Sequence, residues 1–248
     1  KQEKNSRVAL VAFQARQDAF DQAKVRRRRD NRTWALFAGV VIIAAVGSQI
    51  GFAVAGNNAQ PTSSVNAEGN QLPDPSFAQG RAWDASLTIN NIPLILTLDG
   101  KAAPQAVSST LVLAENNFYK NTSCHRLTTT GIFVLQCGDP AGDGTGGPGY
   151  SYGPIENAPV GDLYKAGTIA MARQSGNGSS QGSQFFIVYK DSVIPSDAAG
   201  GYTVIGTITS GLDQLDKLVI SAGTADGAGD GQPKVKSIIS SFKVLPNK

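Results

Sequence analysis

The chain's only histidine and both of its cysteines lie in one short stretch, Ser123 to Pro140, together with an arginine. Histidine and cysteine in proximity are typical of nucleophilic catalysis or of metal binding. A single histidine excludes a multi-histidine metal site, and two cysteines do not make a zinc tetrad. The sequence therefore predicts no metal site. The residue of this stretch whose role is left to explain is the arginine, Arg126.

Two further motifs could carry chemistry. The segment "GDGTGG" at 142–147 matches GxGxxG, but Pro148 follows it and no helix opens there to hold a pyrophosphate. The segment "GSSQG" at 178–182 matches the serine-hydrolase elbow, but it leads from a polar loop into a strand, and His125 precedes Ser180 in the chain. We interpret both as loops, and keep a serine hydrolase with Ser180 as nucleophile as an alternative.

The elements that must position these residues are mostly short strands. Apolar runs separated by Gly, Pro, Asn or Asp extend from about residue 83 to 245, which is typical of a β-sandwich or barrel. Residues 103–116 and 211–223 instead show helical spacing, and Pro104 stands at a natural helix start. We therefore predict a mainly-β body with two helices. The predicted strands are 85–89, 94–98, 123–127, 132–137, 166–172, 183–189, 202–208 and 238–245.

Charge divides the chain into a basic start and a mildly acidic body. Residues 1–33 hold ten Lys or Arg against four Asp or Glu, whereas residues 34–248 hold twelve against fifteen. Outside the first 33 residues there is no stripe of arginine and aromatic residues, so the body shows no sign of a nucleic-acid groove. Residues 1–32 read as a basic cytoplasmic helical segment, either a solvated extension or a helix that docks on anionic lipid or a membrane partner.

The stretch 33–55 contains no charged residue and is long enough to cross a bilayer as a helix. The arginines of "KVRRRRDNR" precede it, and the positive-inside rule places that end in the cytoplasm. A buried core helix and a cleavable signal peptide, suggested by "AVA" at 53–55, are the alternatives. We expect an uncleaved single-pass anchor at 33–55, a flexible linker at 56–81 and a folded domain at 82–248 outside the cytoplasmic membrane.

The pairing of the two cysteines stays open at this stage. A disulfide could persist outside the membrane. Along a continuous strand, however, Cys124 shares a face with Arg126, while Cys137 points opposite to Gln136. If Arg126 and Gln136 both face the site, a Cys124–Cys137 bond needs a bulge.

Several motifs in order resemble the cyclophilins. They are "FYKNTSCHRLTTTGIFVLQCGDPAGDGTGG", "AGTIAMARQSGNGSSQGSQFFIVY" and "YTVIGTITSGLDQLDKL". Together they contain the family's HR, F-x-x-Q-x-GD, GTGG, MA, GSQFFI and VxG elements, spread over about residues 94–245. The resemblance implies an eight-stranded antiparallel barrel closed by two helices, and peptidyl-prolyl cis-trans isomerase activity without metal or organic cofactor.

The resemblance also implies roles for individual residues. Arg126 matches the catalytic arginine, and His125 beside it is expected to be a satisfied structural histidine rather than an acid or base. Gln136 and Gln184 match residues that orient the peptide and the arginine. Ala172 and Arg173 are expected to hold an extended peptide through their backbone. The remaining positions expected to bind substrate are Phe133, Val134, Met171, Phe186 and Tyr202.

This sequence departs from the family pattern in three ways. "RLTTTGIF" has two more residues than usual between the arginine and the phenylalanine, Tyr202 replaces a frequent histidine, and Arg173 replaces a frequent asparagine. The tryptophan that many members use to bind cyclosporin is missing. We expect a membrane-anchored bacterial isomerase, resembling actinobacterial forms, that acts on X-Pro bonds of exported or membrane proteins. The alternative is a non-catalytic subunit that holds a proline-containing segment of a membrane protein complex.

Overall fold

The structure is a computed structural model that describes residues 64–65 and 71–245. These residues belong to the compact unit formed by residues 59–248. The predicted basic helix at 1–32 and anchor at 33–55 lie outside the described residues, as does half of the predicted linker, at 56–63 and 66–70. No helix within the described ranges is long and apolar enough to cross a membrane.

All eight predicted strands are confirmed, and one of them is interrupted. The run at 123–127 forms two short strands with a break at His125. The strands are β3 (Ala82–Ile89), β4 (Ile92–Asp99), β5 (Ser123–Cys124), β6 (Arg126–Thr128), β7 (Val134–Cys137), β9 (Thr168–Met171), β10 (Phe185–Val188), β12 (Val204–Ser210) and β14 (Ser237–Val244).

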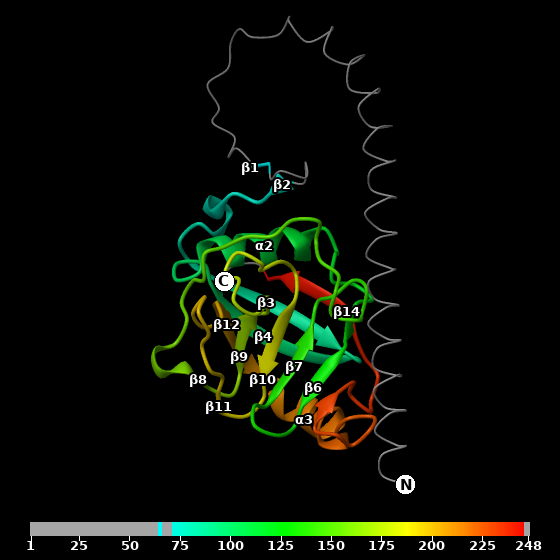
Figure 1. Ribbon diagram of the computed structural model, residues 1–248. Coiled ribbons are helices and arrows are strands. Elements are labelled where there is room, and N and C mark those ends of the chain that lie inside the picture. Colours follow the sequence, from blue (N-terminus) through cyan, green and yellow to red (C-terminus); the bar gives the residue numbers. More distant parts are fainter. Residues whose placement is uncertain (1–63, 66–70, 246–248) are drawn as a thin grey trace, which may run out of the picture. The chain divides into compact units, whose positions relative to one another are not determined.

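These strands form one curved antiparallel sheet, shown in Figure 1 as a half-barrel. Its order is β13-β6-β7-β10-β9-β12-β4-β3-β14-β5, where β13 is the short strand Asp230–Gly231. The expected eight strands become ten for two reasons. The break at His125 divides one strand, and β13 adds a two-residue pairing to β6 that the sequence did not predict.

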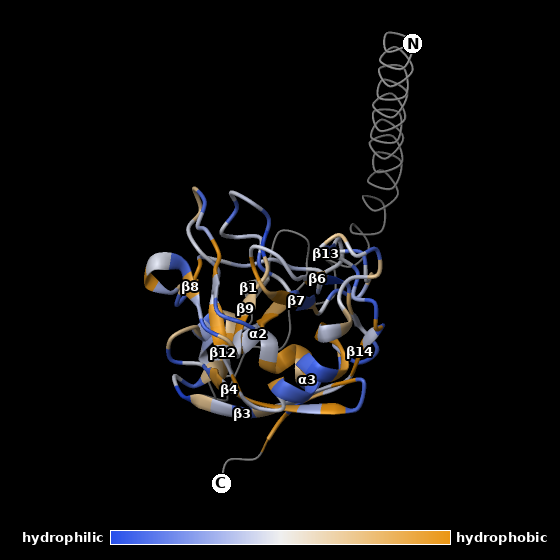
Figure 2. Cartoon of the chain, turned by 90° about the horizontal axis from the view of Figure 1, so that it is seen from below, coloured by the Kyte–Doolittle hydropathy of each residue, from blue (hydrophilic) through white to orange (hydrophobic). Residues whose placement is uncertain are grey.

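Both predicted helices are present, at opposite ends of the half-barrel (Figure 1). The first, α2 (Pro104–Glu115), begins at Pro104 and receives its N-terminal cap from a distant residue, because the Glu156 carboxylate accepts the Gln105 and Ala106 amides at 3.0 and 2.9 Å. The second, α3 (Leu212–Leu218), buries Leu215 and exposes polar side chains, so Figure 2 shows it with a hydrophobic and a hydrophilic side. A 3-10 turn, η4 (Ile220–Ala222), follows α3.

The central strands β7, β9 and β10 are buried on both faces. Alternate side chains enter the main core between the sheet and the helices, as Leu135, Met171 and Phe185 do. The intervening side chains form a second, smaller cluster on the other face, with Val134 and Phe186 among its members. Near-continuous apolar runs such as "QFFIVY" are the sequence signature of this double burial.

Residues 71–81, which the sequence placed in the linker, are folded onto the body. A 3-10 turn, η2 (Pro75–Ala78), packs on α2, and Ala78 is fully buried. The buried Ser108 hydroxyl accepts the Ala78 amide and donates to the Pro75 carbonyl, both at 2.9 Å. Polar and proline-containing composition indicated a tether, but these local contacts order the segment. Just before η2, β1 (Ser64–Val65) and β2 (Gln71–Leu72) pair with each other.

A second small sheet lies beside the apolar cluster. It pairs β8 (Leu163–Tyr164) with β11 (Ser192–Val193), and it follows the 3-10 turn η3 (Val160–Asp162). Its position brings Ile194 into the cluster, since the Ile194 amide donates to the Asp162 carbonyl at 2.9 Å.

The replacement Ser108→Ala tests whether residues 71–81 belong to the fold. The variant leaves the Ala78 amide without its buried acceptor, and we expect it to lower the free energy of unfolding by about 1–3 kcal/mol. Urea denaturation measures this change. The control is Ser210→Ala at an exposed position, expected to change stability by less than about 0.5 kcal/mol. Equal stability of the two variants would contradict the assignment.

Candidate functional site

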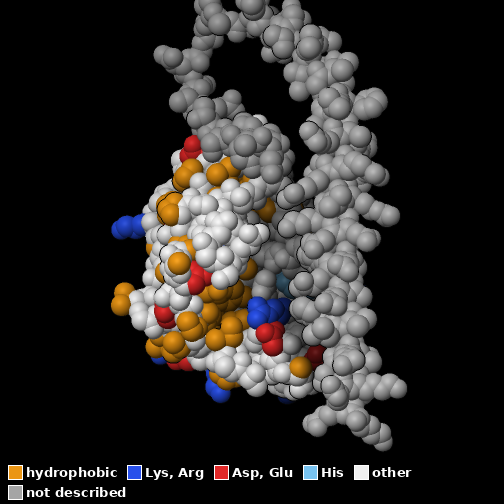
Figure 3. Space-filling model, in the orientation of Figure 1, with side chains coloured by type: hydrophobic (Ala, Val, Ile, Leu, Met, Phe, Trp, Pro, Cys, Tyr) orange, Lys and Arg blue, Asp and Glu red, His pale blue; other side chains and the backbone are white. Residues whose placement is uncertain are grey.

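Arg126 stands at the edge of a small cavity of about 170 Å³ that is lined by both apolar and polar side chains. Figure 3 shows hydrophobic side chains gathered in a hollow on this face, with a basic and an acidic side chain in contact at its edge. The cavity is smaller than the roughly 300–1,000 Å³ of a pocket for a drug-sized ligand, and suits a single small ring. Its lining residues are Arg126, Ile132, Val134, Gln136, Ala172, Arg173, Phe186, Ile194 and Tyr202.

Strand alternation decides which predicted residues reach this cavity. Val134 and Gln136 on β7 and Phe186 on β10 all project to the same side, because Phe186 lies opposite Gln136 in the register. Met171, expected in the site, projects to the other side of β9. It is 1% exposed and belongs to the main core, so its side chain does not line this cavity.

Phe133 also lies outside the lining of the cavity, contrary to expectation. Its ring meets the Tyr189 ring edge-on at 5.9 Å between centroids, and the Lys190 ammonium lies 4.4 Å from its centre. Ile132 and Ile194 line the wall instead. Neither isoleucine was predicted, because Phe133 is the residue that matches the family pattern and the run "DSVIPS" around Ile194 carries no catalytic signal.

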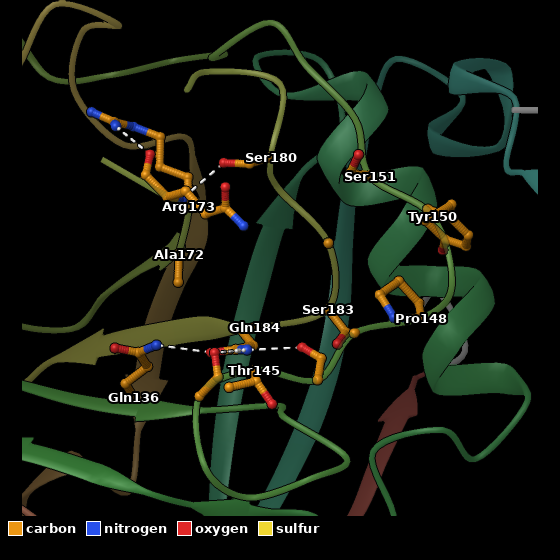
Figure 4. Close-up of a pocket in the computed structure, with 15 residues that line it drawn as sticks. Gln136, Thr145, Pro148, Tyr150, Ser151, Ala172, Arg173, Ser180, Ser183 and Gln184 are labelled. Atoms are coloured by element: carbon orange, nitrogen blue, oxygen red, sulfur yellow. Dashed lines mark hydrogen bonds between the residues drawn. The ribbon is translucent and has the colours of Figure 1, made fainter. Parts of the chain in front are cut away.

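A larger and more polar cavity of about 470 Å³ shares Gln136, Ala172 and Arg173 with the small one. Figure 4 follows a hydrogen-bond chain along its floor, in which Gln136 Nε2 donates to Gln184 Oε1 at 2.9 Å. Gln184 Nε2 then donates to the carbonyls of Gly144 and Gly146. Gln184 therefore fixes both the Gln136 amide and the glycine loop at 142–147, which forms a wall of this cavity rather than a phosphate-binding turn.

The Arg173 guanidinium is buried and saturated. Its side chain is 1% exposed and makes five hydrogen bonds, two to the Asp197 carboxylate and three to backbone carbonyls. These bonds use all five N–H donors of an arginine. The Tyr202 ring lies 4.6 Å from the guanidinium carbon and packs edge-on against Phe186 at 5.5 Å, so Arg173 supports the cavity wall and has no side-chain donor left for a ligand.

The backbone around Ala172 is less open than expected. The Ala172 amide donates to the Gln184 carbonyl at 2.9 Å, and the Met171 amide donates to the Thr203 carbonyl at 2.8 Å. A peptide that pairs with this segment must therefore use other backbone atoms.

Arg126 forms a two-point ion pair with Asp230 on β13. Nε donates to Oδ1 at 2.7 Å and Nη2 donates to Oδ2 at 2.8 Å. This hydrogen bonding raises the pKa of Arg126 and lowers the pKa of Asp230, so both groups are charged at neutral pH. Asp230 was not predicted, because it lies 104 positions from its partner, in a glycine-rich loop.

Cys124 and Cys137 form a disulfide. Because the strand is interrupted at His125, the side chains of Cys124 and Arg126 need not point to the same face. Cys124 is buried, whereas Arg126 is exposed. The expectation that Cys124 and Arg126 share a strand face is therefore wrong. The bond joins β5 to the end of β7, directly beside Arg126 and Gln136.

His125 is partly buried next to Arg126, and its buried Nδ1 atom has no hydrogen-bond partner among the described residues. The expectation of a satisfied histidine is not met. Burial lowers the pKa of His125, the charge of Arg126 lowers it further, and the carboxylates of Asp139 and Asp143 act in the opposite direction. The Ser180 hydroxyl is engaged elsewhere, since it donates to the Asn177 carbonyl and accepts the Gln174 amide.

Comparison with known proteins agrees with this arrangement. The model of the family described as cyclophilin type peptidyl-prolyl cis-trans isomerase matches residues 85–244. The chain belongs to the cyclophilin family. The matched range includes Arg126, both cavities and the Asp230 loop.

Individual relatives support the same assignment. A probable peptidyl-prolyl cis-trans isomerase B of Mycobacterium tuberculosis is 44% identical over 170 residues, which cover 63% of this chain and 52% of that protein. This cyclophilin chain thus spans about half the length of the mycobacterial relative. A peptidyl-prolyl cis-trans isomerase of Helicobacter pylori is 40% identical over 136 residues, or 54% of this chain and 78% of the relative.

Solved structures agree as well. A crystal structure of a Cryptosporidium parvum cyclophilin type isomerase, determined in the presence of the dipeptide Ala-Pro, matches with a TM-score of 0.55 and 28% identity. The match covers 66% of this chain and 99% of that one.

The lowered pKa of His125 predicts a pH-dependent stability. Below its ordinary pKa of 6.5 the unfolded chain takes up a proton that the folded chain resists, so stability falls as the pH drops through 6.5. Because His125 is the only histidine, His125→Gln should remove most of the change between pH 7.5 and 5.5. Urea denaturation across this range measures the effect, and parallel pH profiles of the two proteins would contradict it.

Proposed function

We propose that this cyclophilin catalyses cis–trans isomerisation of X-Pro peptide bonds. The proposal rests on one observation, a charged guanidinium at the rim of a small cavity that has an apolar wall. An X-Pro amide resists rotation because the nitrogen lone pair is delocalised into the carbonyl, with a barrier of about 18–20 kcal/mol. Lowering this barrier needs neither a nucleophile nor a metal.

The proline ring is the group that fits the small cavity. Val134 on β7, Phe186 on β10 and Ile194 just after β11, each at most 5% exposed, offer an apolar lining, and Tyr202 closes the wall. Transfer of an apolar ring from water into such a site is favourable by roughly 25 cal/mol per Å² of surface buried. The ring is thereby anchored while the rest of the amide turns.

Arg126 acts on the rotating bond. As the amide twists, the prolyl nitrogen becomes pyramidal and gains a lone pair that accepts a hydrogen bond. A guanidinium that donates to this nitrogen stabilises the twisted state more than either planar state, which lowers the barrier. Gln136, held by Gln184, presents its amide at the border of the two cavities, where it orients the peptide carbonyl.

Replacement of Arg126 tests the mechanism. In Arg126→Ala the twisted amide loses its donor, and we expect kcat/KM for an Ala-Pro peptide to fall by about 100-fold or more. Exchange NMR on the full chain measures the rate. The control is Lys165→Ala, which removes an exposed cation paired to Asp191 and should leave the rate within about twofold of wild type.

The outcomes separate the two functional readings. A variant that folds, as judged by its melting temperature, and isomerises the peptide at the wild-type rate would refute the role of Arg126. A wild-type chain that binds proline peptides without turnover would instead favour the accessory subunit.

We further propose that the isomerase domain works outside the cytoplasmic membrane, on exported or membrane proteins. Two features support this location. The disulfide Cys124–Cys137 is of a kind that persists in oxidising compartments. The uncharged stretch 33–55 follows a cluster of arginines, as in a single-pass anchor with a cytoplasmic N-terminus.

Protease accessibility tests the location. The experiment uses bacterial cells that express the full chain, with the outer layers opened so that protease reaches the outer face of the cytoplasmic membrane. Added protease should degrade the isomerase domain, while a cytoplasmic marker protein survives. The same domain should stay with the membrane fraction after a high-salt wash. Protection of the domain until the cytoplasmic membrane is lysed would reverse the proposed topology.

A further inference from the structure

Arg126, at the edge of the cavity, and its partner Asp230 are both partly exposed to solvent. Their side chains are 44% and 52% exposed, so both could change rotamer freely without the hydrogen bonds between them. An arginine side chain has several rotatable bonds, and a freely rotating guanidinium would offer its donors to the amide only part of the time. The two parallel hydrogen bonds at 2.7 and 2.8 Å fix both the position and the plane of the guanidinium.

We propose that Asp230 is the positioning residue for Arg126 in prolyl isomerisation, an inference that rests on the proposed function. Asp230 occupies Nε–H and one hydrogen of Nη2. Nη1 and the second hydrogen of Nη2 stay available to a substrate, since an arginine carries five donors. The ion pair thus directs the guanidinium without consuming it, in contrast to the saturated Arg173.

Asp230 is itself held by the unusually long segment after Arg126. In the pairing of β13 with β6, Asp230 lies opposite Thr128 and Gly231 opposite Leu127. The Thr129 amide donates to the Gly229 carbonyl at 2.7 Å, which extends the pairing by one residue. The "TTTG" segment at 128–131 therefore serves as a docking edge for the loop that carries the carboxylate.

The loop around Asp230 is braced from within. Asp226 Oδ1 accepts the Ala228 amide at 3.0 Å, and the Ala225 amide donates to the Gln232 carbonyl at 2.8 Å. The first bond lies before Asp230 in the chain, and the second joins the segments on either side of it. These bonds fix the backbone that carries the Asp230 carboxylate.

Gln136 does not take over this task. Its amide donates to Gln184, so it is directed along the floor of the larger cavity. Across residues 71–245, Asp230 is the only acidic side chain that forms an ion pair with Arg126. The position of the arginine therefore depends on a residue from the far end of the chain.

The test compares Asp230→Asn, Asp230→Glu and the control Asp216→Asn, which removes an exposed negative charge from α3. In Asp230→Asn we expect kcat for an Ala-Pro peptide to fall by about tenfold, while KM changes by less than about twofold, because a positioning contact acts on the twisted state. Asp230→Glu, which keeps the carboxylate, should recover part of the loss. Asp216→Asn should match wild type.

Two readouts exclude a merely structural effect. The ¹H–¹⁵N signal of the Arg126 Nε–H should shift and broaden in Asp230→Asn but not in Asp216→Asn. In an Arg126→Ala background, Asp230→Asn should cause no further loss of rate, since contacting residues are not additive.

Each result decides the inference. With an active wild type, an unchanged or increased kcat in Asp230→Asn overturns the positioning role and leaves the proposed isomerase function in place. An unaltered Nε–H signal would do the same. An inactive wild-type chain overturns the proposed function, and the positioning role falls with it.

Discussion

Burial of β7, β9 and β10 on both faces is the constraint on which the site depends. One set of side chains must fill the main core, so the alternate set is delivered to the other face whatever its chemistry. Phe185 and Met171 are thereby committed to the core, and Phe186 and Val134 to the cavity. A slip of one residue in any of these strands would exchange the two sets, which makes the register of the sheet as important to the cavity as the residues themselves.

Two arginines line this cavity, and they differ in burial and in the number of N–H donors that are already hydrogen-bonded. Arg173 is buried, and a buried charge is tolerated only when paired and fully hydrogen-bonded, as it is here by Asp197 and three carbonyls. Arg126 is half-exposed and keeps donors unused. The two arginines thus differ in burial and in the number of N–H donors left free, and only Arg126 keeps donors that a peptide could use.

The sequence predicted the strands and helices, which depend on the spacing of apolar residues and on the Gly, Pro, Asn and Asp residues between them. All eight apolar runs became strands, and both helical segments became helices. The resemblance to the cyclophilins implied one site for Arg126, Val134, Gln136 and Phe186, and all four line the small cavity. Prediction from the sequence failed where a non-local contact decides. The disulfide between Cys124 and Cys137, the packing of Phe133 on Tyr189 and the ion pair of Arg126 with Asp230 all join residues from different parts of the chain.

The cluster of Arg173, Asp197 and Tyr202 has a consequence for sequence variation within the family. Asp197 braces the guanidinium and also accepts the Gly176 and Ala199 amides, while Tyr202 covers the guanidinium with its ring. Loss of the carboxylate alone would strand a buried cation, and loss of the arginine alone would leave the aromatic wall unsupported. These three positions should consequently be exchanged together between relatives, as a linked set whose intermediates are unstable.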